Sequence, residues 1–376
     1  MSQSIEVVIP VHDPERPIER GIRSVIDQLP ELSVLGVSLR VTVVCHNMDT
    51  ADLLVAELSG HEAVSWLTFT DGVKSPAGPR NFALARSSAT YLSFLDSDDF
   101  LEPGSLAAWW KVAQENNAAA VIAPLRTPEG FILPSPRIRP SKPAVLDAVR
   151  DGLAYRSVPY GLLRRESLLK IGYRYAEGVP TGEDIEPTLK LWFRSGAVCY
   201  PYGAPAYHQT DDSGAARVTS SIRPLQEEFQ WLDRLMKSEW LLQATQIERR
   251  SIALKILRVH GVGALVRRAD AAGLPGPSSL WDETERQRWA GLADRLFAFA
   301  GGSLPALSRR DAALTQAAAE ASDARELVSA VERHQKSGRP GELLTDKPFS
   351  VLARDSVLRH YLNERRRMKA GVFAGH

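Results

Sequence analysis

The amino-acid sequence predicts an α/β domain with a mostly parallel sheet flanked by helices, followed by an all-α domain. Over residues 1–222, strand and helix patterns alternate with short connections, which is typical of layered α/β folds. From Arg223 onward the strand pattern disappears. The charge changes at the same place, because residues 1–222 hold 21 Lys and Arg against 26 Asp and Glu, and residues 223–376 hold 25 against 19. We therefore predict two domains, residues 1–222 and 223–376.

Short runs rich in β-branched and apolar residues mark the strands of the first domain. They cover residues 5–11, 41–45, 64–69, 91–95 and 119–123, with shorter strand-like pieces at 198–201 and 204–207. Helices are expected over residues 16–28, after residue 50, and over residues 78–88, 102–117 and 188–192, and residues 162–171 are expected to form a turn and a helix. Residues 124–143 are rich in proline and are expected to form a loop or a short edge hairpin.

The second domain carries apolar residues at helical spacing, for example Ile252, Ile256 and Val259. Its helices are expected over residues 225–243, 246–271, 280–299, 309–336 and 350–369, separated by turns that contain Gly and Pro. Arg365, Arg366 and Arg367 form either a solvated helix end or a contact with acidic lipid or polymer.

The overall composition excludes several classes of protein. A formal net charge of +1 on 376 residues gives no strong field, so we expect no nucleic-acid partner. Cys45 and Cys199 lie in apolar runs and are expected to be buried free thiols in a reducing compartment. We expect no signal peptide and no membrane span. The expected location is the cytoplasm, with contact at the inner face of the plasma membrane left open.

The strand over residues 91–95 ends abruptly at an acidic turn that contains Asp96, Asp98 and Asp99. Carboxylates this close repel one another, so they need a cation or good hydrogen bonds. Residues i and i+2 of an extended segment point the same way, so Asp96 and Asp98 could reach one ion. Mg²⁺ and Mn²⁺ prefer such oxygen ligands. The alternative is a polar turn followed by a helix N-cap.

Other polar residues follow the neighbouring predicted strands. His12 and Asp13 follow the first strand, His46 and Asn47 the second, and Asp71 the third. In open α/β sheets the ligand lies outside the carboxyl ends of the strands. The sequence therefore predicts a binding site at this edge of the sheet.

Five motifs, taken together, resemble those of the family-2 glycosyltransferases of GT-A fold. They are Val8–Asp13, the helix start Gly78–Asn81, the turn Leu95–Asp99, the segment Gly182–Asp184 and a histidine loop at His208. The resemblance covers about residues 1–222 and extends to the bacterial wall-polymer, teichoic-acid-type branch. It implies a hexosyltransferase-type enzyme that moves a sugar from a nucleotide-diphosphate donor to a glycan or cell-wall polymer acceptor.

The resemblance also implies a metal cofactor, Mn²⁺ or Mg²⁺, held by Asp96, Asp98 and His208. The metal would act as a Lewis acid on the leaving diphosphate. His208 has an alternative interpretation as an ordinary surface or capping histidine. Residues implied in donor binding are Pro10, His12, Asp13, Asn47, Asp71, Lys74, Arg80, Asn81, Asp96 and Ser97. Arg80 and Lys74 lie where a helix start and cations favour phosphate, although both could be solvated loop charges.

Asp184 is the predicted general base, and Glu183 is predicted to orient the acceptor. An inverting transfer needs one carboxylate that takes the proton of the acceptor hydroxyl while the leaving group departs from the opposite face. No covalent nucleophile is evident, so direct displacement is expected. The alternative is a pair of acids favoured by the positive end of a helix dipole.

One feature departs from the family pattern. Family members carry acidic residues after the second strand, where this chain has His46 and Asn47. Asn47 both donates and accepts hydrogen bonds, so nucleotide binding is still expected. The departure leaves the base open, and a UDP-sugar is the default from the resemblance.

Two other functions are open alternatives. A nucleotidyltransferase is disfavoured, because the first strand runs into His12, Asp13 and Pro14 instead of a glycine-rich phosphate loop. A non-catalytic scaffold or binding protein is compatible with the altered residues His46 and Asn47. For residues 223–376 we expect either homo-oligomerisation or acceptor positioning by a basic surface.

Overall fold

The computed structural model describes residues 3–53, 58–137, 139, 141–211, 222–272 and 281–369. The described residues fall into two compact units. The first lies within Met1–Asp147 and Arg156–Ala215, and the second lies within Ala148–Tyr155 and Ala216–Ala370. A short segment inside the first predicted domain, Ala148–Tyr155, therefore belongs to the helical unit.

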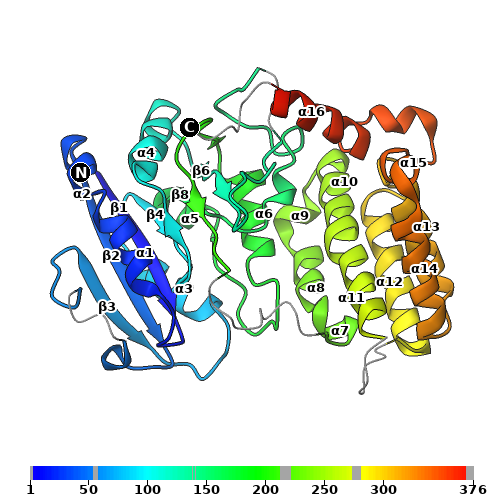
Figure 1. The fold of residues 1–376 in the computed structure, drawn as a ribbon, viewed down its shortest axis with the longest axis horizontal. Coiled ribbons are helices and arrows are strands. Elements are labelled where there is room, and N and C mark those ends of the chain that lie inside the picture. Colours follow the sequence, from blue (N-terminus) through cyan, green and yellow to red (C-terminus); the bar gives the residue numbers. More distant parts are fainter. Residues whose placement is uncertain are drawn as a thin grey trace. The chain divides into compact units, whose positions relative to one another are not determined.

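A seven-stranded sheet forms the centre of the first unit (Figure 1). Its order is β3 (Val64–Phe69), β2 (Val37–His46), β1 (Gln3–Val11), β4 (Tyr91–Phe94), β8 (Gly161–Arg164), β6 (Ala120–Ile122) and β9 (Val198–Cys199). The strands from β3 to β4 pair in parallel, and β8 is antiparallel to both of its neighbours. This confirms the predicted α/β class with a mostly parallel sheet.

Six α-helices accompany the strands in the described part of this unit: α1 (Ile18–Ile26), α2 (Leu29–Val34), α3 (Ala77–Arg86), α4 (Ser105–Glu115), α5 (Arg165–Lys170) and α6 (Ile185–Arg194). On α1, Ile18, Ile22 and Val25 are buried, as their spacing predicts. The helix predicted over residues 16–28 begins later and is followed at once by α2. In place of the helix predicted after residue 50, the described residues between β2 and β3 contain a 3₁₀ turn, Thr50–Asp52.

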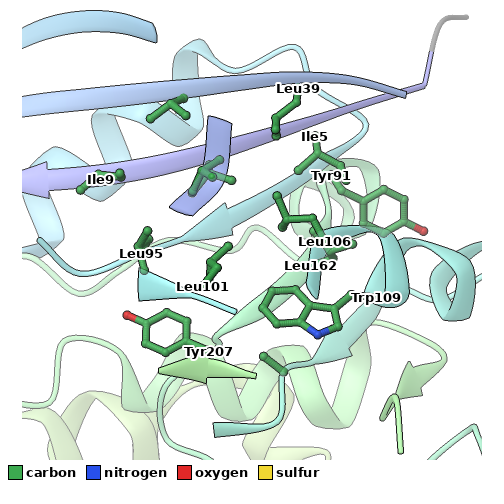
Figure 2. Close-up of a cluster of buried hydrophobic side chains, with 14 of the residues drawn as sticks. Ile5, Ile9, Leu39, Tyr91, Leu95, Leu101, Leu106, Trp109, Leu162 and Tyr207 are labelled. Atoms are coloured by element: carbon green, nitrogen blue, oxygen red, sulfur yellow. The ribbon is translucent and has the colours of Figure 1, made fainter. Parts of the chain in front are cut away.

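The core of this unit joins buried side chains of the sheet and of α4 in one cluster (Figure 2). Ile5 and Ile9 of β1 are fully buried, and Trp109 of α4 is buried with its indole N–H donating to the carbonyl of Pro205. Residues two or four positions apart in a strand lie on the same face of the sheet, which explains why Ile5 and Ile9 point into the same core. Both cysteines are buried and free, as predicted, and burial raises the pKa of each to about 11.

A second, three-stranded sheet lies beside the acidic turn. Its order is β5 (Phe100–Leu101), β10 (Tyr207–His208) and β7 (Leu125–Arg126). β10 pairs with β5 in antiparallel register, which sets His208 opposite Phe100. This pairing brings residues 207–210 to the turn at residues 96–99.

The second unit is helical in its described residues, as predicted. It contains α7 (Leu225–Glu228), α8 (Gln230–Lys237), α9 (Glu239–Leu242), α10 (Gln246–Lys255), α11 (Val262–Ala271), α12 (Glu283–Phe299), α13 (Arg309–Glu320), α14 (Ala324–Lys336), α15 (Gly338–Leu343) and α16 (Val357–Lys369). Within the described residues, no helix combines the length and apolar character that crossing a bilayer requires.

Local capping divides the helices more finely than apolar spacing predicts. The helix predicted over residues 309–336 is two helices, because Asp323 accepts hydrogen bonds from the N–H groups of Arg325 and Glu326 and starts α14. The helix predicted over residues 225–243 is three short helices. A π-helical turn, Ile256–Gly261, joins α10 to α11, where a side chain at Gly261 would meet the ring of Trp289 at 3.1 Å.

Candidate active site

The parallel strands β1, β2, β3 and β4 end at one edge of the sheet, and the predicted site residues follow them. Asp96 lies two residues after the end of β4, and the main-chain N–H of the intervening Leu95 still donates to the carbonyl of Val8. Asp96 is held at the sheet edge, and the chain turns back on itself through Asp99, whose N–H donates to the carbonyl of Asp96.

Two side chains donate hydrogen bonds to the carboxylate of Asp96. Arg80 of α3 donates to Oδ1 at 2.6 Å, and the hydroxyl of Tyr160 donates to Oδ2 at 2.6 Å. Burial alone would lower the pKa of Arg80, but the charge of Asp96, together with smaller contributions from Tyr175, Glu183 and Tyr160, raises that pKa well above its ordinary value. Arg80 therefore carries a full positive charge beside the acidic turn.

Asp98 is held by different partners. Arg16, in the loop after β1, donates to Asp98 Oδ2 at 2.5 Å. The main-chain carbonyl of Asp98 accepts hydrogen bonds from Arg20 and from the hydroxyl of Thr210. Each aspartate that was predicted to bind metal is thus paired with its own arginine, and both keep part of the carboxylate at the surface.

No function of Asp99 is predicted from the sequence, but in the structure this residue stabilises the acidic turn. It is buried, its Oδ2 accepts the hydroxyl of Tyr207 at 2.8 Å, and its Oδ1 accepts the N–H of Thr210 at 2.8 Å. Burial, and then the nearby charge of Asp96, raise the pKa of Asp99 to about 7. Tyr207 also accepts the N–H of Asp96, so one phenol connects both ends of the turn.

Arg80 links the acidic turn to the second predicted pair of acids. Its Nη1 lies 3.7 Å from Oε1 of Glu183, and its guanidinium lies over the ring of Tyr175. Asp96 and Glu183, which are far apart in the sequence, are therefore brought to one arginine. The structure places the two predicted halves of the site together.

Asp184 occupies the N-cap position of α6, although its side chain does not cap the helix. Burial raises the pKa of the Tyr175 phenol, an effect that Arg80 opposes. The carboxylates of Asp184 and Asp96 both raise it further, so each lies within electrostatic range of that phenol. Asp184 is next to Glu183 in the sequence, and its charge acts on the same phenol as the charge of Asp96.

The residues after β2 and β3 form a separate hydrogen-bonded cluster. His46 Nε2 lies 2.8 Å from Asp71 Oδ1, and Asn47 Oδ1 accepts the N–H groups of Asp71 and Gly72. Asn47 adopts a left-handed conformation with φ of 57°. The predicted pair Asn47 and Asp71 is therefore brought together, and Gly78 is needed nearby because a Cβ there would lie 2.5 Å from Asp71 Oδ2.

The remaining predicted donor-binding residues have varied surroundings. Pro10 is near the end of β1, His12 and Lys74 are exposed, Asp13 is partly buried, and Ser97 is buried. Asn81 donates to the carbonyl of Tyr175 and to Glu177, and it accepts the N–H of Tyr175. Both ends of its amide are thus engaged with a neighbouring loop, and contact with a donor would require these bonds to be exchanged.

Among the described residues, no three His, Cys, Asp or Glu side chains form a group that could hold a metal ion. His208 stacks on Phe100 with ring centroids 4.4 Å apart, and its Nδ1 lies 3.0 Å from the carbonyl of Gln209. His208 therefore does not converge with Asp96 and Asp98. The two carboxylates still fit Mg²⁺ or Mn²⁺, because Mg²⁺ commonly takes one or two carboxylates and completes its shell with phosphate oxygens and water.

Several site residues were missed by sequence reasoning. They are Arg16, Arg20, Asp99, Tyr160, Tyr175, Tyr207 and Thr210. Asp99 stands in the acidic turn, and Tyr207 directly precedes His208, so nearness to a motif was the available signal. Nothing in the sequence around Tyr160 indicates its bond to Asp96.

Solved structures with a similar fold include a fragment of S. aureus TarS. S. aureus TarS 1–349 in complex with UDP-GlcNAc superposes with a TM-score of 0.64 at 15% identity, covering 89% of this chain and 92% of that one. The same TarS fragment in complex with UDP gives a TM-score of 0.59 at 16% identity, covering 92% and 95%. At this level of identity the likeness shows the fold, which is of the GT-A type.

Residues 6–172 match the family model described as Glycosyl transferase family 2. Residues 6–172 therefore resemble this family in sequence, in agreement with the resemblance of the motifs. Poly(ribitol-phosphate) beta-glucosyltransferase of Bacillus spizizenii is 23% identical over 223 residues, 58% of this chain and 34% of that protein. Succinoglycan biosynthesis protein ExoU of Rhizobium meliloti is 29% identical over 153 residues, 37% and 43%. The chain spans less than half of either relative.

Proposed function

We propose that this protein is a metal-dependent, inverting glycosyltransferase that moves a hexose from a UDP-sugar to a glycan or cell-wall polymer by direct displacement. The observation that carries the proposal is Arg80, which joins Asp96 of the acidic turn to Glu183, beside Asp184. The family match supports the reaction class. The relative that acts on poly(ribitol-phosphate) and the TarS structures with UDP and UDP-GlcNAc support the acceptor and donor classes.

Asp96 and Asp98 are the residues that would hold the cation. When bound with the donor, Mn²⁺ or Mg²⁺ would neutralise negative charge on the diphosphate. Donor binding would require Arg16 and Arg80 to exchange their present carboxylate partners, at least in part, for diphosphate oxygens. Guanidinium groups suit that exchange, since they bind carboxylate and phosphate with the same fork of N–H donors. His208 is proposed to contact the diphosphate after a change of ring position.

Asp184 is proposed to take the proton of the acceptor hydroxyl on a carboxylate oxygen as that hydroxyl oxygen forms the new glycosidic bond. For this it must come within about 2.6–3.2 Å of the attacking oxygen. Glu183 is held near Arg80, so we assign it to orienting the acceptor and Arg80 rather than to proton transfer. The other residues proposed to bind the donor are Pro10, His12, Asp13, Asn47, Asp71, Lys74, Asn81 and Ser97.

The proposal is tested by incubating the protein with a panel of UDP-sugars, Mn²⁺ and a poly(ribitol phosphate) acceptor, and by measuring UDP release. We expect release with at least one donor, increased by the acceptor and abolished by chelation of the metal. Absence of turnover across nucleotide sugars and across glycan and polyol-phosphate acceptors would contradict the proposal.

A non-catalytic scaffold protein with a nucleotide-sugar-transferase fold is the second candidate. The observation that favours it is the cluster of His46, Asn47 and Asp71, whose polar groups are engaged with one another where the nucleotide base would be recognised. Calorimetry with UDP and UDP-sugars, with and without Mn²⁺, gives the distinction. An enzyme should bind UDP in a metal-dependent manner, whereas absence of metal-dependent nucleotide binding favours the scaffold.

The helical unit is proposed either to mediate homo-oligomerisation or to position the acceptor. Its sequence excess of Lys and Arg motivates acceptor positioning, because wall polymers such as poly(ribitol phosphate) are polyanions. Analytical ultracentrifugation of the full chain tests the first role. We also propose that the protein is located in the cytoplasm.

A further inference from the structure

The end of the helical unit contains a segment that is both basic and apolar at its surface. This basic apolar segment, Lys347–Lys369, comprises a 3₁₀ helix, η5 (Pro348–Leu352), and α16 (Figure 1). It holds seven Lys and Arg and two Asp and Glu, a balance of +5 in 23 residues. The proposed catalytic site uses none of these residues.

Large apolar side chains of this segment face solvent. Phe349 is 92% exposed and Leu352 is 68% exposed. In a 3₁₀ helix, side chains at i and i+3 lie on the same side, so Phe349 and Leu352 project together. Leu362 of α16 is 42% exposed. Exposed apolar side chains that gather in one segment mark a contact surface more often than scattered ones do.

Basic side chains surround the apolar residue of α16. Arg359, Arg365 and Arg366 lie three or four residues from Leu362, so they are its neighbours on the helix surface. All three are exposed. Arginine can lay its methylene stem along an apolar surface while its guanidinium reaches charged groups.

The segment is anchored to the rest of the helical unit, so its exposed side chains do not reflect a loose chain end. Ser356 between η5 and α16 is fully buried, accepts the N–H of Arg359, and donates to the carbonyl of Val351. Arg258 of the π-helical turn donates to the carbonyl of Asp355. Phe349 and Leu352 are thus presented from a fixed position.

We propose that the basic apolar segment docks the protein on an anionic lipid bilayer. Lipid is the partner that uses both features, because anionic headgroups attract the arginines and the acyl boundary accepts Phe349 and Leu352. A second copy of the segment would bring two surfaces of +5 together. A dissolved polyanion would pair with the arginines but would gain nothing from an exposed phenylalanine.

The test is cosedimentation of the full chain with phosphatidylcholine vesicles and with vesicles containing about one third phosphatidylglycerol. We expect binding to the anionic vesicles that weakens as salt is raised. The triple variant Arg359→Gln, Arg365→Gln, Arg366→Gln should bind on the order of 100-fold more weakly, since each basic residue contributes roughly fivefold. The double variant Phe349→Ser, Leu352→Ser should also lose most binding.

Matched controls lie on the same unit. Leu242→Ser with Ile247→Ser removes apolar residues that are also exposed, and Lys237→Gln with Arg325→Gln and Arg333→Gln removes three exposed charges elsewhere. Both sets should bind anionic vesicles like the original chain. Absence of vesicle binding would overturn the proposal, and so would an equal loss of binding in the control variants. It would also be overturned if the double variant Phe349→Ser, Leu352→Ser bound soluble polyphosphate and still bound anionic vesicles as tightly as the original chain. None of these measurements depends on glycosyltransferase activity.

Discussion

Each unit holds a cluster of acidic and basic side chains, and the two clusters differ in how far they are exposed to solvent. In the first unit, the side chains of Asp96 and Asp98 are 29% and 21% exposed beside Arg80 and Arg16. In the helical unit, Asp311 is 7% exposed and pairs with His334, which is 10% exposed, at 2.9 Å. Similar chemistry is open to a ligand in one place and closed in the other.

The hydrogen bonds around each cluster support the same distinction. Oδ2 of Asp311 also lies 3.7 Å from Nε of Arg258, an ion-pair distance. The main-chain N–H of Asp311 donates to the hydroxyl of Ser308, and its main-chain carbonyl accepts the hydroxyl of Thr315. The acidic turn instead takes its partners from distant segments, such as Tyr160 and Thr210. An enclosed network of this kind stabilises the packing of helices, whereas a partly exposed network drawn from distant segments can form a site.

The largest expected effect is on the open cluster. Asp98→Asn removes the charge that would hold the cation, so we expect transfer to fall by roughly 10³-fold or more. The free energy of unfolding should change by about 1 kcal/mol or less, because the pair with Arg16 is partly exposed. Initial rates and urea unfolding provide the two readouts. A large loss of stability with retained turnover would remove the distinction between the clusters.

Asp311→Asn should show the reverse pattern. Loss of charge in a buried pair leaves Arg258 and His334 without their partner, which costs about 3 kcal/mol of unfolding free energy. Turnover per folded molecule should stay close to that of the original chain. If the variant unfolds like the original, the closed cluster is not a stabilising one.

The effect of Asp311 should also depend on pH. Burial alone would raise its pKa, but hydrogen bonds from His334 and Ser308, with the charge of Arg258, lower the pKa below 3.8. The stabilisation is therefore fully present above the unfolded pKa of about 4 and is lost as pH falls toward the folded value. The difference in unfolding free energy between the original chain and Asp311→Asn should shrink between pH 5 and about pH 3. A constant difference would contradict this origin.

Tyr207→Phe should lower activity less than Asp98→Asn does, with a modest loss of stability. It removes the donor to Asp99 and the acceptor of the Asp96 N–H, so we expect about 1–2 kcal/mol of destabilisation. Turnover should fall by about tenfold because the turn loses its register. Tyr91→Phe is the matched control, since its buried hydroxyl donates to Ala118, away from the turn. Equal losses of activity in both would make the effect one of folding alone.

The sequence predicts those parts of the fold that depend on the local pattern of apolar and polar residues. The strand Tyr91–Phe94 and the turn after it could be predicted, because an apolar run that ends in carboxylates specifies a buried strand with a polar end. The partners of those carboxylates could not. Arg16 pairs with Asp98 across 82 residues and Tyr207 with Asp99 across 108, and only packing brings such segments together.

The site was therefore predictable as a set of residue types at a sheet edge, but its internal pairing was not. Glu183 and Arg80 illustrate the point, because each was named for its own motif and the contact between them comes from the placement of α3 and α6. Likewise, the break between α13 and α14 depends on the cap at Asp323, a local signal that the longer apolar spacing concealed.

The central claim is that Asp184 removes the acceptor proton beside a donor held at the acidic turn. Single-turnover transfer from an accepted UDP-sugar, measured together with donor affinity, tests it in Asp184→Asn, with Glu186→Gln on the same helix as the control. The account predicts unchanged donor affinity and transfer slowed by roughly 10²–10⁴-fold in Asp184→Asn only. Transfer at the original rate in Asp184→Asn would contradict it.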